Sequence, residues 1–267
     1  MNITKASFTS KARTWLLLAA LTALFIGIGA ALGGAFLWLF VIFSVLMNFA
    51  AYWMSDKFAI RASRAQEVSP AEAPDLHRMV EELAQLYSVP KPRVYMIPSE
   101  QPNAFATGRN PEHAAVAVTQ GLLQYLPRDQ VRGVLAHEFS HIKNRDILVS
   151  SMAAMIAGAV SAIGNIFFWT SLFGDDDDNP LGAIGSLVLI VVAPLAASLL
   201  QLGVSRQREY LADATAARML GTGEPLAEAL ETLDRGRKQI PLPVNPAMTV
   251  LSAVNTTAPF QFCVMPP

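Results

Sequence analysis

The sequence predicts a mostly helical α+β membrane protein, and three observations carry this prediction. The 267 residues are 52% hydrophobic and 15% charged, with a mean hydropathy of +0.36, which is too apolar for an ordinary soluble domain. Four apolar runs are each about the 20 residues that a helix needs to cross a bilayer, and they cover residues 14–32, 35–54, 149–173 and 181–204. A polar segment, residues 55–146, separates the second run from the third and contains short strand patterns.

The four apolar runs predict two transmembrane hairpins. Gly33 and Gly34 separate the first two runs, and the acidic sequence GDDDDNP separates the third from the fourth. A cleaved signal peptide is disfavoured, because a second apolar run follows the first at once. Buried helices of a soluble protein are the other alternative, but charge-free runs of this length are rare in soluble cores.

Basic residues indicate which side of the membrane holds the polar segment. They lie before the first run and after the second and the fourth, and they are Lys5, Lys11, Arg13, Lys57, Arg61, Arg64, Arg206 and Arg208. These clusters share one side if all four runs cross, and the positive-inside rule makes this side cytoplasmic. We therefore expect a multi-pass protein of the cytoplasmic membrane, with the lipid bilayer as a partner.

Changes in composition divide the chain into four segments. We expect a transmembrane hairpin at 1–54, a cytoplasmic domain at 55–148, a second hairpin at 149–204, and a cytoplasmic helical segment with an irregular tail at 205–267. The formal net charge of −1 provides no basic field for nucleic acid, so we expect no nucleic-acid partner. The single cysteine, Cys263, excludes an internal disulfide framework.

The polar segment predicts a small sheet and helices before and after its strands. SPAEAPDLHRMVEELAQLYSVP places Leu76, Met79, Val80, Leu83 and Leu86 at helical spacing, which predicts an amphipathic helix. PRVYMIP, NAFATG and AAVAVTQGLL are typical of three strands, the last two on either side of the turn RNPEH. PRDQVRGVLAHEFSHIKNRDI then predicts a helix, and SRQREYLADATAARML and PLAEALETLDRGRKQ predict two more after the fourth run.

The sequence LAHEFSH predicts a metal site on the helix that closes the polar segment. His137 and His141 are four residues apart, so their imidazoles project from one helical face about one turn apart. This spacing can place two nitrogens on a tetrahedral zinc ion. Glu138 follows the first histidine directly, where its carboxylate can act as general base on the attacking water. A chance pair of surface histidines is the alternative, but the pattern arises in only about two in a thousand chains of this composition.

A catalytic zinc ion needs a third protein ligand, and Glu209 is the candidate. His77 and His113 are the other two histidines, and neither lies in a ligand pattern. Glu209 follows the fourth run directly, so it lies on the same side of the membrane as the histidine pair. Asp213 lies four residues later on the same helical face, where it can accept the free N–H of a ligand histidine. A solvated charged face is the alternative interpretation for both carboxylates.

Together these segments resemble the HtpX-type membrane-bound zinc metalloproteases, which are relatives of the CAAX prenyl proteases. The resemblance covers most of the chain and rests on two N-terminal spans, PNAFATGRNPEHAAVAVTQGLL, LAHEFSHIKNRD, two further spans and SRQREYLADATAARM. It implies a cytoplasmic zincin-like catalytic domain with one zinc ion per chain. The site residues implied by the resemblance are the ligands His137, His141 and Glu209, the general base Glu138, and Asp213 in support of a ligand histidine.

The resemblance also implies a substrate class and a location. It implies hydrolysis of misfolded or surplus membrane proteins, or of other unfolded polypeptides, at the cytoplasmic face of the inner membrane, as part of protein quality control. NAFA is similar to the edge strand on which gluzincins bind the substrate backbone, which implies that Asn103 and Ala104 position the substrate. A turn residue after Pro102 is the alternative for Asn103.

Three questions stay open at the level of the sequence. The donor that stabilises the oxyanion is one of Arg206, Tyr210 and His113, which the sequence does not rank. A membrane scaffold that binds zinc and cleaves nothing would need the three ligands but not Glu138. An intramembrane protease is disfavoured because polar residues surround the motif, namely Arg132, Lys143, Asn144, Arg145 and Asp146.

Overall fold

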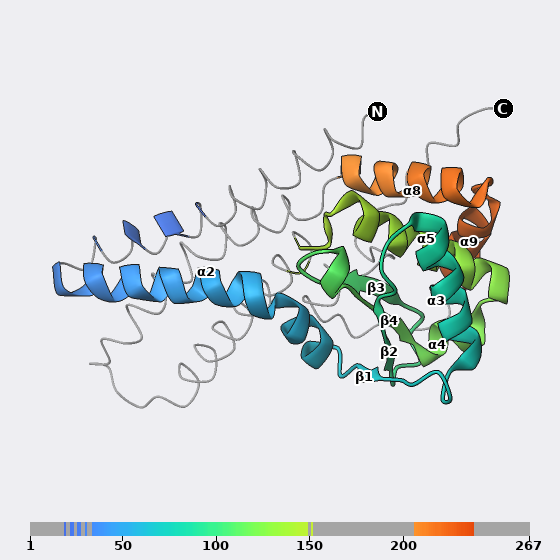
Figure 1. Ribbon diagram of the computed structural model, residues 1–267, viewed down its shortest axis with the longest axis horizontal. Coiled ribbons are helices and arrows are strands. Elements are labelled where there is room, and N and C mark those ends of the chain that lie inside the picture. Colours follow the sequence, from blue (N-terminus) through green and yellow to red (C-terminus); the bar gives the residue numbers. More distant parts are fainter. Residues whose placement is uncertain are drawn as a thin grey trace.

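The computed structural model describes residues 34–148, 151 and 206–237, together with the isolated positions 19, 22, 23, 26, 27 and 30. This part of the chain consists of one long helix that projects to one side and a group of shorter helices around a small sheet (Figure 1). Most of the first predicted span, the third and fourth spans apart from Ser151, the acidic sequence between them and the tail after residue 237 lie outside the described residues.

The small sheet predicted for the polar segment is confirmed and has four strands in the order β1-β2-β4-β3. The strands are β1 (Gln66–Glu67), β2 (Arg93–Ile97), β3 (Ala104–Thr107) and β4 (Ala115–Thr119). β2 and β4 are parallel, whereas β1 pairs antiparallel with β2 and β3 pairs antiparallel with β4. β3 is therefore an edge strand of this sheet. The sequence had not predicted β1, which is only two residues long.

The third predicted strand is shorter than its apolar pattern indicates. AAVAVTQGLL forms β4 as far as Thr119, and the next residues form the short helix α4 (Gln120–Tyr125). Thr119 ends the strand because its Oγ1 accepts a hydrogen bond from the N–H of Leu122 at 3.1 Å, which caps the new helix. The RNPEH turn contains a short 3-10 helix, η1 (Pro111–His113).

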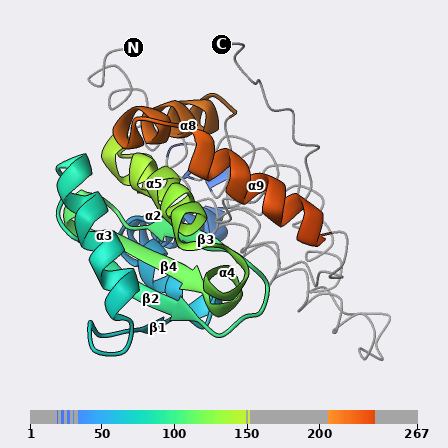
Figure 2. The same ribbon diagram turned by 90° about the vertical axis from the view of Figure 1, so that its right-hand side faces the viewer.

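Two predicted helices, α3 (Pro74–Tyr87) and α5 (Arg128–Asn144), pack against one face of the sheet (Figure 2). Four of the five apolar residues at helical spacing in α3 are buried, but Leu86 is exposed and Tyr87 takes its place in the core. The Tyr87 hydroxyl donates to the Ala136 carbonyl oxygen at 2.7 Å, and its ring packs on Phe139 with 5.6 Å between ring centroids. This contact fixes α5, the helix that carries the histidine pair, against α3.

The long helix α2 (Gly34–Ala62) contains the second predicted span and continues beyond it. Leu37–Met54 is long and apolar enough to cross a membrane, with a mean hydropathy of 1.8, and no other helix within the described residues meets the same test. The last turns of α2 leave this stretch and pack against the face of the sheet opposite α3 and α5. Ala59 is buried there with a second apolar cluster, formed by Tyr95, Ile97, Phe105, Ala115 and Ala117.

The two predicted helices after the fourth run, α8 (Arg206–Leu220) and α9 (Glu224–Arg237), are also confirmed, and both pack against α5. Gly133 allows the close contact with α9, because a Cβ at this position would lie 2.6 Å from the backbone nitrogen of Leu226. Along α8, Ala212 and Ala216 are buried one turn apart. Their small side chains let α8 lie close to α5, so that residues distant in sequence meet at the histidine pair.

Candidate metal centre

The histidine pair lies on one face of α5, as the four-residue spacing predicts. The Nε2 atoms of His137 and His141 are 3.1 Å apart, and their ring planes are inclined at 83°. His137 is buried and His141 is nearly so, with side-chain exposures of 7% and 14%. Both imidazoles therefore direct Nε2 toward a common point that is largely shielded from water.

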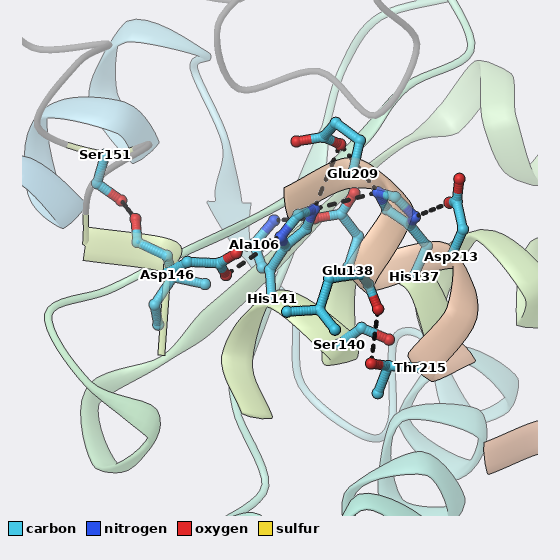
Figure 3. A network of polar contacts seen from close by, with 12 residues as sticks. Ala106, His137, Glu138, Ser140, His141, Asp146, Ser151, Glu209, Asp213 and Thr215 are labelled. Carbon is cyan, nitrogen blue, oxygen red and sulfur yellow. Dashed lines mark hydrogen bonds and ion pairs between the residues drawn. The ribbon is translucent and has the colours of Figure 1, made fainter. Parts of the chain in front are cut away.

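Glu209 reaches the same point from the first turn of α8. Its Oε2 lies 3.5 Å from His137 Nε2 and 3.7 Å from His141 Nε2 (Figure 3). Ligand atoms 2.0–2.1 Å from a tetrahedral zinc ion are separated from one another by roughly 3.3 to 3.4 Å. The three observed separations bracket this value, and within the described residues this is the group of three donors close enough to hold one metal ion.

Each histidine is held by a carboxylate through its other ring nitrogen. His137 Nδ1 lies 2.8 Å from Asp213 Oδ1 on α8, and His141 Nδ1 lies 3.1 and 3.2 Å from the two oxygens of Asp146. A proton on Nδ1, donated to the carboxylate, leaves the Nε2 lone pair free to bind a metal. Two such lone pairs and a carboxylate oxygen then lie close together. These electron-rich atoms repel one another unless a cation lies between them.

The charged groups around this point favour a positive charge at the site. Burial alone lowers the pKa of His137, but hydrogen bonds with Asp213 and Glu209 outweigh it and raise the pKa to about 9. Burial raises the pKa of Glu209, but hydrogen bonds and charge interactions with both histidines outweigh it and hold the pKa well below its usual range. Protons therefore supply the positive charge when no metal is bound, and a metal ion must replace them. Two imidazoles and one carboxylate suit zinc among the common metals.

Glu138 is buried between this cluster and the edge strand. Its Oε2 accepts a hydrogen bond from the backbone N–H of Ala106 on β3 at 2.7 Å, which fixes the carboxylate near the histidine pair (Figure 3). Burial raises the pKa of Glu138, against the lowering effect of His137 and His141. A carboxylate that is held in this way can take a proton from a group bound beside the cluster.

Asn103 and Ala104 lie at the start of the edge strand. The Asn103 N–H donates to Thr119 Oγ1 at 2.8 Å, and its carbonyl oxygen accepts from the Thr119 N–H at 2.9 Å. Asn103 is therefore hydrogen-bonded to the end of β4, and hydrogen-bonded and non-hydrogen-bonded pairs alternate along an antiparallel ladder. The backbone groups of the alternate residues Ala104 and Ala106 consequently point away from β4. This outer edge is the side on which Ala106 contacts Glu138.

The remaining sequence candidates lie outside the cluster. His77 Nε2 lies 2.9 Å from the Val68 carbonyl oxygen, and His113 Nδ1 lies 2.7 Å from Asn110 Oδ1 in the turn after β3. Tyr210 is 51% exposed, and the side chain of Arg206 is outside the described part of the chain. None of the contacts in the described part brings these residues to the metal centre, so the oxyanion donor is not assigned.

Asp146 is the one residue of the cluster that sequence reasoning missed. α5 ends at Asn144, and Arg145 adopts a left-handed conformation with φ of 58°. This reversal turns the chain back, so the N–H of Asp146 bonds to the His141 carbonyl oxygen while its carboxylate bonds to the ring. A helical face contains residues three and four apart, so a contact five residues away was not expected. The signal available in the sequence was an acidic residue two positions after the end of the histidine helix.

The chain is similar to several known proteins. The family model described as Peptidase family M48 matches residues 70–260. A protein named Protease HtpX homolog from Persephonella marina is 50% identical over 250 residues, covering 91% of this chain and 87% of its own length. Relatives of the same name from Desulforapulum autotrophicum and Pyrococcus furiosus are 46% and 49% identical, covering 97% and 91% of this chain and 86% of their own lengths. The crystal structure of S. mikatae Ste24p matches with a TM-score of 0.49 and 21% identity, over 93% of this chain and 63% of that one.

Proposed function

The chain belongs to peptidase family M48 and is a membrane-associated metalloprotease, and on this premise we propose that it is a zinc endopeptidase whose active site is the cluster on α5 and α8. The observation that carries the proposal is the meeting of three metal-ligand atoms, from two helices distant in sequence, beside a buried carboxylate. The resemblance that LAHEFSH and SRQREYLAD establish in the sequence agrees with this assignment.

In this proposal His137, His141 and Glu209 hold the zinc ion. The separations of 3.1, 3.5 and 3.7 Å between their ligand atoms suit three corners of a tetrahedron. A zinc ion in this position would polarise the scissile carbonyl and lower the pKa of water, the chemistry that such ions supply in hydrolases. Asp213 and Asp146 orient the two imidazoles by accepting their Nδ1 protons.

Glu138 acts as the general base and then as the general acid. It takes a proton from the attacking water and passes it to the nitrogen of the leaving amine. The hydrogen bond from Ala106 supports this role, because it holds one carboxylate oxygen at the edge strand and leaves the other available for proton transfer. A scaffold that bound zinc without cleaving would not need an acid group buried at this position.

The substrate is a polypeptide, and it binds along the outer edge of β3. An extended chain can add to an exposed sheet edge as a further strand, held by main-chain hydrogen bonds. The backbone groups of Ala104 point to this edge, and the contacts of Asn103 with Thr119 fix the start of the strand. Asn103 and Ala104 therefore position the substrate, and misfolded membrane proteins are the substrates that a membrane-bound enzyme of this kind meets.

The proposed topology keeps the active site at the cytoplasmic face of the inner membrane. Transmembrane hairpins at 1–54 and 149–204 would flank a catalytic domain at 55–148, and 205–267 would supply the third ligand. Support comes from Leu37–Met54, which is suited to cross a membrane, and from the basic residues that follow it, Lys57, Arg61 and Arg64. α2 continues past residue 54 into the sheet, so the boundary between the first two segments lies within one helix.

The test compares the full-length protein with a Glu138→Gln variant in detergent. We expect the wild type to cleave an unfolded polypeptide, to lose this activity when a chelator removes the metal, and to regain it when zinc is added back. The variant should bind one zinc ion per chain and lose cleavage, because glutamine keeps the contact with Ala106 but accepts no proton. Glu228→Gln, an exposed residue of α9, is the matched control and should cleave normally. Undiminished cleavage by Glu138→Gln would show that the mechanism is wrong, and a wild type that binds no zinc would contradict the metal assignment.

A further inference from the structure

α2 passes from the membrane into the catalytic domain within about one helical turn. Trp38 and Trp53 lie near the two ends of the apolar stretch Leu37–Met54 and are 70% and 45% exposed, which is typical of aromatic residues at membrane interfaces. Asp56 comes only three residues after Trp53, is buried, and forms an ion pair with Arg93 at the start of β2, with 3.5 Å between Oδ2 and Nη2. The sheet therefore begins where the apolar stretch ends.

The end of the edge strand contacts the interfacial tryptophan directly. The guanidinium carbon of Arg109, two residues after β3, lies 4.5 Å from the centroid of the Trp53 ring, a distance suited to a cation–π contact. Gly108 fixes the turn that leads there. Its φ is 140°, and a Cβ would lie 2.5 Å from the carbonyl oxygen of His113, so only glycine fits. Figure 1 shows the chain between β3 and β4 beside the end of α2.

A second contact ties the same end of β3 to the chain that follows the histidine helix. Thr107 Oγ1 and Ser151 Oγ are 2.7 Å apart, and the Gly108 N–H donates to Ser151 Oγ at 3.4 Å. Ser151 is buried and lies at the start of the third apolar run of the sequence. The end of β3 is thus held by residues at the edges of two apolar runs.

We infer that the Arg109 end of β3 lies at the bilayer surface, so that the enzyme reaches peptide bonds very close to the point where a substrate leaves the membrane. The inference rests on the proposed function and adds a substrate class, the juxtamembrane segments of membrane proteins. Glu138 contacts Ala106, which is three residues before Arg109. The three residues from Ala106 to Arg109 span about 10 Å in extended form, and the length of the Arg109 side chain equals that of roughly two further residues. A substrate therefore needs an extended spacer of about five or six residues to reach from the membrane surface to the site.

A site on the far side of the domain would need a longer spacer. A domain of about 100 residues has a radius of gyration of roughly 13 Å, so its far side lies some 30 Å from the membrane, or about ten extended residues. The shortest spacer that permits cleavage therefore distinguishes the two placements. Long spacers do not distinguish them, because a flexible segment can fold back to either site.

The experiment measures this shortest spacer with the full-length enzyme in lipid vesicles. Each substrate has one transmembrane helix and a single cleavable sequence, joined by a spacer whose length increases along the series. Two series are made, one with the helix before the cleavable sequence and one with the helix after it. We expect cleavage to begin at about five or six residues. A threshold of about ten residues or more, with normal cleavage of an unanchored peptide, would overturn this inference and leave the proposed function intact. No cleavage of the unanchored peptide would instead refute the proposed function.

Arg109→Gln tests whether the contact with Trp53 holds the strand in place. It should raise the shortest spacer by about two or three residues, while the rate on an unanchored peptide stays within about twofold of the wild type. Arg78→Gln is the control, because Arg78 is an exposed residue of α3 that pairs with Asp75. An unchanged threshold in Arg109→Gln, or an equal shift in Arg78→Gln, would contradict the role of Arg109.

A second readout does not depend on activity. In a Cys263→Ser background, a fluorophore is attached at Glu112→Cys, an exposed residue of η1 beside the Arg109 turn, or at Asp75→Cys, an exposed residue of α3. Quencher-labelled lipids should quench the label at position 112 strongly and the label at position 75 weakly. Equal quenching at both positions would place the end of β3 away from the bilayer and overturn the inference.

Discussion

Replacement of Asp146 by asparagine should weaken zinc binding more than any other change outside the three ligands. Both oxygens of Asp146 contact the Nδ1 of His141, at 3.1 and 3.2 Å, and the carboxylate side chain is only 4% exposed. An amide retains one acceptor for the Nδ1 proton but removes a buried negative charge that increases the basicity of the ring. Loss of a partner of this kind costs metal affinity about 10- to 100-fold, which corresponds to about 1.4 to 2.8 kcal/mol.

Asp213→Asn provides the comparison, because the two carboxylates make the same contact in different surroundings. Asp213 lies 2.8 Å from His137 Nδ1, but its side chain is 45% exposed, so water screens its charge. We expect its replacement to cost no more than about 10-fold in affinity, the lower end of the range. Asp75→Asn, a surface change on α3, should have no effect.

Affinity is measured by competition between the protein and a chromogenic zinc chelator at one fixed pH. The unfolding midpoints of the metal-free variants establish that each protein is folded, so that a loss of affinity is not a loss of structure. Wild-type affinity in Asp146→Asn, or a larger loss in Asp213→Asn, would refute the argument that burial makes Asp146 the stronger support.

The remaining predictions concern stability. Gly133→Ala should lower the unfolding free energy, measured by chemical denaturation, by about 1 to 3 kcal/mol, because the new Cβ would lie 2.6 Å from the backbone nitrogen of Leu226. Gly223→Ala is the control and should leave the unfolding free energy unchanged, because its Cβ would meet only a side-chain carbon at 3.6 Å. Tyr87→Phe should cost about 1 to 2 kcal/mol in the same assay, because the buried Ala136 carbonyl oxygen loses its bond from the hydroxyl. Burial raises the pKa of Tyr87 to about 12, so the stability that the protonated hydroxyl provides is complete below pH 10 and is lost as the pH rises through 12. Ultraviolet titration of tyrosinate measures this pKa directly, and ionisation near pH 10 in the folded protein would be incompatible with the buried contact. Zinc at 1,000 times its dissociation constant should stabilise the folded state by about 4 kcal/mol, so an unfolding midpoint that chelation leaves unchanged would argue against a bound metal.

The helices and their buried faces follow largely from residue spacing. The amphipathic pattern in α3 predicts its core residues apart from Leu86, which faces solvent because Tyr87 fills the space against Phe139. The end of β4 was not predicted, because apolar residues resume after Thr119 at Leu122 and Leu123 and make AAVAVTQGLL resemble one longer strand. Thr119 ends the strand by a local side-chain cap that an apolar pattern does not reveal.

The meeting of His137, His141 and Glu209 was predicted from one helix periodicity and one topological argument, and the structure places their ligand atoms together. Asp213 follows from the same periodicity, since it lies one turn after Glu209. Asp146 did not follow, because it reaches His141 through a left-handed residue after the helix end rather than along a helical face. Periodicity describes contacts within a regular element, and this contact depends on how the element ends.

The central claim is that zinc is held by two imidazoles and one carboxylate at the meeting of α5 and α8. Zinc K-edge X-ray absorption on the purified full-length protein measures this ligand set directly. We predict a shell of nitrogen and oxygen atoms at about 2.0 to 2.1 Å with the signature of two imidazoles, and the loss of one imidazole in His141→Ala. A sulfur ligand at about 2.3 Å, or the same two-imidazole signature in His141→Ala, would contradict the claim.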